Sequence, residues 1–140
     1  PALADDNRWM HRPRLDPAAL ARSETEGTLE ARIFGAIASY LGIRKGVPAF
    51  APDAPFETLH APNEHLVLCV RTPRPDVPGA RVLVAGNFAP ERVRLQLASL
   101  PPDLGRPARE LLPGRGAVLD LEGGRLELAP YGLAWLELRD

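Results

Sequence analysis

The chain of 140 residues carries 17 Lys and Arg against 18 Asp and Glu, so its formal net charge is −1. This near balance does not supply the positive field that binding to nucleic acid requires, and we expect no nucleic-acid partner. Charged residues make up 25% and hydrophobic residues 45% of the chain, a composition typical of a globular protein and not of a disordered tail. We expect one folded domain, with room for an appendage.

Proline and glycine contribute 16 and 12 residues, and they stand singly between short apolar runs. This distribution predicts turns between many short strands. The sequence has no run of about 20 uncharged apolar residues, so we expect no membrane span. The first residues lack the basic and then apolar pattern of a secretory signal. We therefore expect a cytoplasmic protein, with the location left open if Pro1 is a cut end.

Two helices are predicted in the first 50 residues. Asp16 followed by Pro17 is a typical helix start, because aspartate accepts from free amides and proline suits the first position, and a helix of about two turns should follow. A second helix is expected over 29–45, with Thr28 as its cap and Gly46 at its end.

The second predicted helix carries apolar residues at spacings of three and four, which form one stripe. They are Leu29, Ile33, Phe34, Ile37, Tyr40 and Leu41. Such a stripe needs a partner surface. We infer that the amino-terminal third packs on the strands that follow it, or that both pack on protein that is missing from this chain.

From Phe50 onward the pattern changes to short apolar runs bounded by Pro, Gly, Asn or Asp, which favours an antiparallel β-sandwich. The predicted strands are 56–60, 65–71, 81–88, 92–97, 108–112, 118–121, 125–128 and 133–138. Residues 82–85 and 133–136 are apolar at every position, so we expect both faces of these strands to be covered. The single cysteine, Cys69, lies in one of the runs and is predicted to be a buried thiol and not a nucleophile.

Few residues of the chain suggest catalysis. The carboxylates have no spacing that would bring two of them to face each other, as glycoside hydrolysis requires. The histidines are not accompanied by the serine motif that a Ser-His catalytic triad would need. His60, Glu64 and His65 could offer three ligands, but zinc sites usually show more ligands at tighter spacing, so a polar hairpin is favoured. We expect no metal and no cofactor. Tyr131 and Trp135 are assigned to a motif or to the core.

Residues 5–14 are unusual for an unstructured leader, because Asp-Asp-Asn-Arg-Trp-Met-His-Arg-Pro-Arg combines two acids, a tryptophan and three arginines. An arginine beside a carboxylate can line a pocket, or hold sugar hydroxyls through its fixed fork of donors. The alternative is a frayed and solvated arm, which composition alone favours.

This segment resembles the late part of amylosucrases and related sucrose hydrolases, which are enzymes of glycoside hydrolase family 13 in the alpha-amylase superfamily. The resemblance spans essentially the whole chain, and its first motif is fairly specific to the sucrose-using branch. It continues through Arg32-Ile33-Phe34, Ile43-Arg44-Lys45, Asn63-Glu64-His65 and Gly86-Asn87-Phe88, and it closes with Leu-Ala-Pro-Tyr-Gly-Leu-Ala-Trp-Leu-Glu at 128–137. Pro17 departs from the tryptophan common in relatives, which puts acceptor preference in doubt.

The resemblance implies that residues 1–50 are the end of the last loop and the last helix of a (β/α)8 barrel, and that 51–140 are a Greek-key β-sandwich of the alpha-amylase C-terminal type. It implies that Arg8 contacts the glucosyl unit in the sugar pocket, with Asp6 and Trp9 as support. The catalytic carboxylates of such retaining glucosyl transferases come from earlier barrel strands. The implied partners are sucrose, α-glucan and the catalytic barrel of the same protein.

Two other readings stay open. One is a free-standing sandwich that binds glucans, which would need exposed and coplanar aromatic side chains. The other is an inert interaction domain. Strands that are apolar on both faces, and a helix without a full partner, are what an excised part of a larger enzyme should show, and Pro1 in place of methionine is compatible with a cut.

Overall fold

The structure is a computed structural model, and it describes residues 16–139. The chain divides into two compact units, Pro1–Leu41 and Gly42–Asp140. Within the described residues, the first unit is helical and the second holds two antiparallel sheets. The predicted domain boundary after residue 50 stays a prediction.

Both predicted helices are confirmed, and each begins at the expected cap. Helix α2 is Pro17–Ser23, and Asp16 Oδ1 accepts from the Ala18 amide at 2.9 Å. Helix α3 is Leu29–Lys45, and Thr28 Oγ1 accepts from the Ala31 amide at 3.1 Å. Local capping chemistry therefore suffices to define where both helices start.

Helix α3 displays its apolar stripe without burying any residue. Leu29, Ile33, Phe34, Ile37 and Leu41 are each about half exposed or more. Among the described residues, no helix is long and apolar enough to cross a membrane. The stripe has the character expected of a packing face, and the surface that would cover it stays a prediction.

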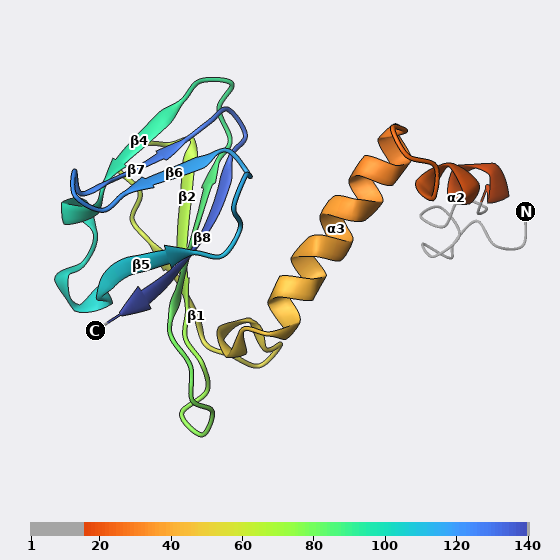
Figure 1. The fold of residues 1–140 in the computed structure, drawn as a ribbon. Helices are drawn as coiled ribbons and strands as arrows, with labels where there is room; N and C mark the ends of the chain where they lie inside the picture. The colour runs from red at the N-terminus through yellow and green to blue at the C-terminus, as the bar shows by residue number, and fades with distance from the viewer. Residues whose placement is uncertain (1–15, 140) are drawn as a thin grey trace, which may run out of the picture. The chain divides into compact units, whose positions relative to one another are not determined.

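The second unit consists of eight strands in two sheets (Figure 1). The strands are β1 Phe56–Leu59, β2 Leu66–Arg71, β3 Val82–Asn87, β4 Val93–Gln96, β5 Arg106–Glu110, β6 Ala117–Asp120, β7 Arg125–Leu128 and β8 Leu133–Arg139. The larger sheet has the order β1-β2-β3-β8-β5 and the smaller one β4-β7-β6, with every pair antiparallel. A mainly β, sandwich-like domain is confirmed; its Greek-key connectivity and the barrel origin of the helices stay predictions.

Strand β5 begins two residues earlier than the sequence predicts. Pro107, which the pattern treats as a strand breaker, lies inside β5 opposite Leu138, and the register shifts between Pro107 and Arg109. This is possible because β5 is an edge strand, where a proline without an amide hydrogen removes no ladder bond. The proline and the irregular register also make this edge a poor template for pairing with another strand.

The core lies between the two sheets and comes mainly from alternate residues of β2, β3, β4, β7 and β8. From the larger sheet, Leu68, Leu83 and Leu136 are almost completely buried. Leu95 and Leu126 meet them from the smaller sheet. The sequence alternates strictly between polar and apolar residues over 92–97, which predicts a strand with one wet face. Strand β4 does alternate between buried and exposed residues.

Candidate functional site

The sequence-predicted sugar-pocket residues lie outside the described part of the chain. Arg8 and its supports Asp6 and Trp9 belong to residues 1–15, and the structure describes 16–139. Their roles therefore stay predictions.

The predicted polar hairpin between β1 and β2 does bring two of its three candidate ligands close. His65 Nε2 lies 3.6 Å from Glu64 Oε1, and both side chains are exposed. Asn63 Oδ1 accepts from the His65 amide at 2.8 Å and fixes the turn. No three His, Cys, Asp or Glu side chains within residues 16–139 are grouped so that they could hold a metal ion. These side chains act in the turn, as a polar hairpin would.

The titratable side chains with shifted pKa values do not form an acid and base pair. Burial raises the pKa of the Cys69 thiol, which keeps it protonated and unreactive, as predicted. The two guanidinium groups of Arg94 and Arg92 lower the pKa of Glu127. Among the carboxylates with a resolved shift in the described residues, Glu110 has the raised pKa, and burial is the cause. One raised carboxyl without a second group facing it is not a glycosidase arrangement.

Glu110 offers a stability prediction with a definite pH dependence. Its Oε1 is buried and has no hydrogen-bond partner, so the folded state disfavours the charged form. A folded-state pKa above the unfolded value means that stability is highest below the unfolded pKa and is lost as pH rises through the folded one. We expect Glu110→Gln to raise Tm at neutral pH, with the gain vanishing near about pH 4.

Glu127 provides the control of opposite sign for that experiment. Ion pairs of 2.7 Å with Arg94 and Arg92 lower its pKa. The Glu127 carboxylate therefore stabilises the folded state at pH values above the unfolded pKa, and this stabilisation is lost as the pH falls. Glu127→Gln should lower Tm at neutral pH and have little effect in acid. Thermal unfolding of both variants between about pH 4 and 8 checks the pair, and parallel curves would contradict the assignment.

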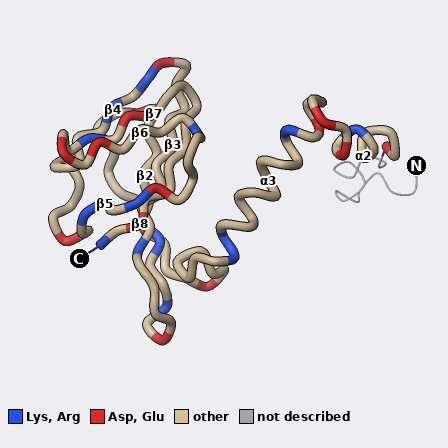
Figure 2. The backbone as a smooth tube through the Cα atoms, viewed as in Figure 1, with Lys and Arg blue, Asp and Glu red and all other residues tan. Residues whose placement is uncertain are grey.

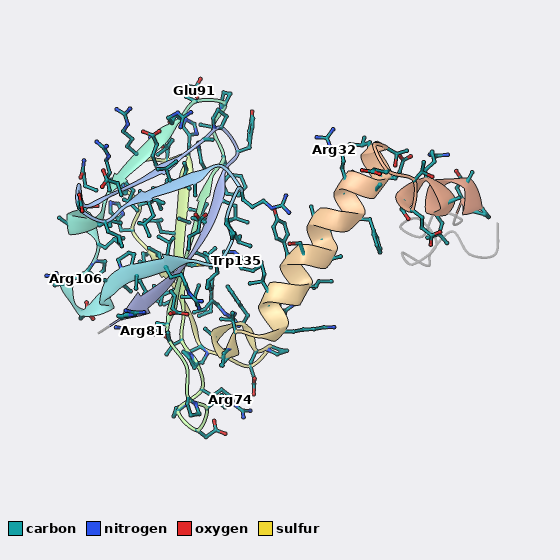
Figure 3. All side chains as sticks on the ribbon, in the orientation of Figure 1. Arg32, Arg74, Arg81, Glu91, Arg106 and Trp135 are labelled. Carbon is teal, nitrogen blue, oxygen red and sulfur yellow. The ribbon has the colours of Figure 1, made fainter. Side chains whose placement is uncertain are left out.

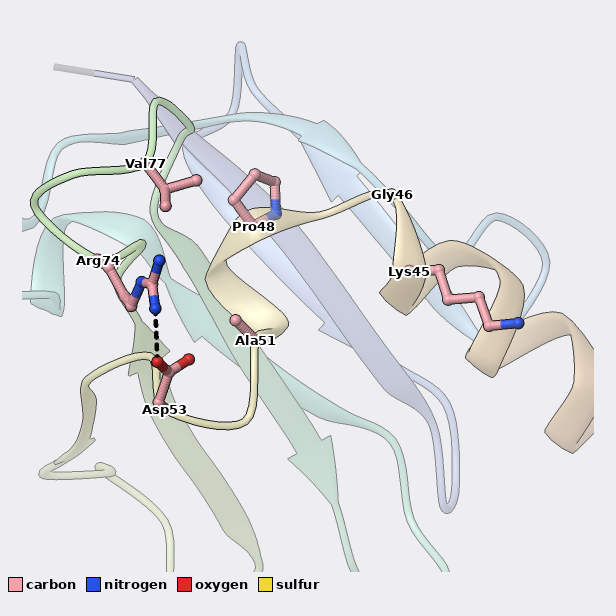
Figure 4. Close-up of a pocket in the computed structure, with 7 residues that line it drawn as sticks. All are labelled: Lys45, Gly46, Pro48, Ala51, Asp53, Arg74 and Val77. Atoms are coloured by element: carbon pink, nitrogen blue, oxygen red, sulfur yellow. Dashed lines mark hydrogen bonds and ion pairs between the residues drawn. The ribbon is translucent and has the colours of Figure 1, made fainter.

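A hollow of about 310 Å³ lies beside the end of α3 (Figure 4). Its polar lining includes Lys45, Asp53 and Arg74. Arg74 donates to Asp53 Oδ2 at 2.8 Å and to Asp76 Oδ2 at 3.0 Å, and the guanidinium lowers the pKa of Asp53. The arginine and the carboxylates of this hollow therefore satisfy one another as ion pairs.

The outer face of the larger sheet is closed at one end by the segment after α3. The 3₁₀ turn Pro48–Phe50 places Ala49 and Phe50 over Val82. The Phe50 ring lies 4.5 Å from that of Trp135, which Figure 3 labels on β8. The Arg71 guanidinium donates to the carbonyls of Ala49 and Ala51 at 3.0 and 2.6 Å. This part of the predicted two-sided covering of β3 and β8 is confirmed.

The other end of the same face is open, and we call it the open end: Val67, Phe88 and Leu133, with Tyr131 in the adjoining turn. Val67 lies opposite Gly86 in the register, and Gly86 lies opposite Leu133. The Phe88 ring rests beside Gly86, because a Cβ there would lie 3.2 Å from Phe88 Cε2. Phe88 is nevertheless 68% exposed and Val67 is 50% exposed.

Tyr131 is predicted to belong to a motif or to the core, and its side chain is 70% exposed, so the structure excludes the core assignment. It adopts φ +55 in a turn that the Gly132 amide closes onto the Ala129 carbonyl at 2.8 Å. A residue other than glycine rarely adopts this conformation. Pro130-Tyr131-Gly132 is a recognisable turn signal in the sequence, but only the backbone reveals that tyrosine takes the position that usually suits glycine or asparagine.

Asn87 ties this end of the sandwich together. Its side chain is buried, with Nδ2 donating to the carbonyls of Glu91 and Ala129 at 2.7 and 2.8 Å and Oδ1 accepting from the Ala89 amide at 2.9 Å. These hydrogen bonds hold the end of β3 against the connection between β7 and β8. The Gly-Asn-Phe motif thus combines close packing, a buried polar hub and an exposed ring.

No known protein-family model matches the chain. Several solved structures share its fold at low sequence identity. An α-glucosyl transfer enzyme, XgtA, matches with a TM-score of 0.60 at 22% identity, over 76% of this chain and 18% of its own. The trehalulose synthase MutB from Pseudomonas mesoacidophila MX-45 matches with a TM-score of 0.58 at 21% identity, over 79% of this chain and 20% of its own.

A MutB mutant in complex with its substrate sucrose gives a TM-score of 0.61 at 20% identity, again over 79% of this chain and 20% of its own. The chain therefore spans about a fifth of the length of these enzymes. The likeness extends to the fold and to most of this chain, and it concerns enzymes that transfer glucosyl units or use sucrose.

Proposed function

We propose that this chain is the C-terminal region of an amylosucrase-like enzyme of glycoside hydrolase family 13, which acts on sucrose and α-glucans. Two likenesses of different origin support the proposal. The motif at residues 5–14 resembles the sucrose-using branch, and the fold over most of the chain resembles an α-glucosyl transfer enzyme and a trehalulose synthase. The main support is that the sequence motif and the fold both resemble enzymes that use sucrose or transfer glucosyl units.

In this proposal the chain is non-catalytic by itself. Arg8 binds the glucosyl unit in the pocket of the longer enzyme, supported by Asp6 and Trp9, and the sandwich stabilises the catalytic barrel of the same protein. The retaining reaction needs two carboxylates that flank the scissile bond. In the proposal these carboxylates belong to the barrel.

We expect no release of glucose or fructose from sucrose by the 140-residue chain. In the longer protein that contains it, Arg8→Ala should lower kcat/KM for sucrose on the order of 10- to 100-fold, because a charge-assisted hydrogen bond contributes about 1.5–3 kcal/mol. Arg22→Ala is the matched control, since Arg22 pairs with Glu30 on an exposed surface. Turnover by the chain alone, or equal effects of both variants, would contradict the proposal.

A free-standing module that binds glucans, or an interaction module, is the second candidate. It requires aromatic side chains that are exposed and coplanar, and the exposed rings of Phe88 and Tyr131 meet the first of these requirements. A titration with maltooligosaccharides, read by tryptophan fluorescence, distinguishes the two: saturable quenching supports the module.

A further inference from the structure

The charged cross-strand pairs of the sandwich include one of like sign. In residues 16–139, four register pairs place two charged residues directly opposite each other. Three of them join opposite charges as ion pairs of 2.7–3.1 Å: Arg94 with Glu127, Arg109 with Glu137 and Arg125 with Asp120. The fourth places Arg106, at the start of β5, opposite Arg139, at the end of β8. Like charges directly opposite each other destabilise a sheet, so stability does not account for this pair.

The two guanidinium groups of this pair share one side of the sheet. Directly opposite residues of antiparallel strands point to the same face, with Cβ atoms about 4.5–5.5 Å apart. Arg106 and Arg139 are both exposed, and neither forms an ion pair with a carboxylate of residues 16–139. Figure 2 shows basic positions on β5 and at the end of β8. Within the described chain, these two cations therefore have no counter-charge and lie within reach of one anion.

The backbone before Arg106 fixes this arrangement and brings a third guanidinium to it. Gly105 adopts φ +83, and a Cβ there would lie 2.5 Å from the Arg139 carbonyl oxygen. Only glycine lets the start of β5 pack so closely against the end of β8. Arg81 Nη2 donates to the Asp103 carbonyl at 2.9 Å and lies 3.6 Å from the same Cβ position. Figure 3 labels Arg81 and Arg106 at this end of the sandwich.

A groove of about 480 Å³ adjoins Arg106. Its walls are the start of β5, the 3₁₀ turn Leu97–Ser99 and the turn between β6 and β7. Beside the Arg106 guanidinium, the side chains that line it are apolar: Leu97, Ala98, Pro107 and Leu121. Leu121 is 53% exposed, so its apolar surface is accessible to a ligand. Cavities of this size, mostly apolar and with few polar groups, are typical of small-molecule sites.

We propose that the Arg106–Arg139 pair and the adjoining groove bind a phosphate monoester with an apolar body. Such an ester carries close to two negative charges at neutral pH, which match two guanidinium groups, and the fixed fork of each group suits phosphate oxygens. The apolar body lies in the groove, against Leu121. The net charge of −1 favours a small anion over a polymeric one. This site is independent of the sugar chemistry proposed above.

Titration of the 140-residue chain with phenyl phosphate at constant ionic strength tests the site, with binding heat and Tm as readouts. We expect saturable binding that is roughly tenfold tighter than that of inorganic phosphate, because the ring buries apolar surface in the groove. Arg106→Gln and Arg139→Gln should each weaken it by about tenfold or more. Arg94→Gln is the matched control, since Arg94 lies opposite Glu127 on the smaller sheet, and it should leave the affinity unchanged.

Stability without ligand gives a second readout. Arg106→Gln removes a like-charge contact and should raise Tm at low salt, whereas Arg94→Gln removes an ion pair and should lower it. Leu121→Ala should leave Tm nearly unchanged and remove the preference for phenyl phosphate over inorganic phosphate.

Several results would overturn the proposal. Equal weakening by Arg94→Gln would show a general effect of charge, and benzoate binding as tightly as phenyl phosphate would show that one negative charge suffices. The absence of saturable binding to the unaltered chain would exclude the site outright. Sucrose turnover by the longer protein depends on none of these measurements, so this proposal and the proposed function fail separately.

Discussion

Replacing Leu136 by alanine should destabilise the sandwich by about 2–5 kcal/mol. Leu136 is completely buried, and it lies in β8 between β3 and β5, opposite the equally buried Leu83. The truncation removes apolar contacts and leaves a cavity that the surrounding sheet can close only in part. Urea unfolding measures the effect as a lower midpoint with an unchanged slope.

Two controls keep this prediction open to refutation even if the alanine variant fails to fold. Leu136→Met conserves volume and should cost less than about 1.5 kcal/mol. Leu121→Ala alters a leucine that is 53% exposed in the turn after β6 and should stay within about 0.5 kcal/mol. Similar losses at Leu121 and Leu136 would show that the core does not lie between the two sheets.

Replacing Asn87 by leucine should be nearly as damaging, with a loss of about 3–5 kcal/mol. The change leaves the Ala89 amide and the Glu91 carbonyl without their partner and removes one of the two donors to the Ala129 carbonyl, which keeps the Gly132 amide. Burial prevents water from replacing the lost bonds fully. Asn87→Asp keeps the acceptor but turns a carboxylate toward two carbonyl oxygens. It should therefore be unstable at neutral pH and partly restored in acid, where the carboxyl becomes a donor.

Asn63 supplies the matched control for the Asn87 series. Its Oδ1 accepts from the His65 amide in an exposed turn, a bond that aspartate preserves. Asn63→Asp should therefore leave both Tm and its pH dependence nearly unchanged. If Asn87→Asp behaved in the same way in thermal unfolding, Asn87 would not be the polar hub of this end of the sandwich.

Local signals in the sequence determined where the elements begin. Asp16 and Thr28 fix the starts of the two helices because their side chains can accept from free amides whatever the rest of the fold does. Strict alternation in 92–97 likewise determined which side of β4 is wet. Both patterns depend only on residues that are a few positions apart in the chain, so they can be identified from one sequence.

Only the tertiary structure determined which apolar residues are buried beneath another segment of the chain. Val82 and Val67 look alike in the sequence, yet Val82 lies beneath the turn Pro48–Phe50 and Val67 remains exposed. Position in the sheet also decided that Pro107 could enter a strand and that Tyr131 lies outside the core. Strand order and the placement of distant segments set these outcomes, because burial depends on what lies opposite a residue in space, and local periodicity does not contain that information.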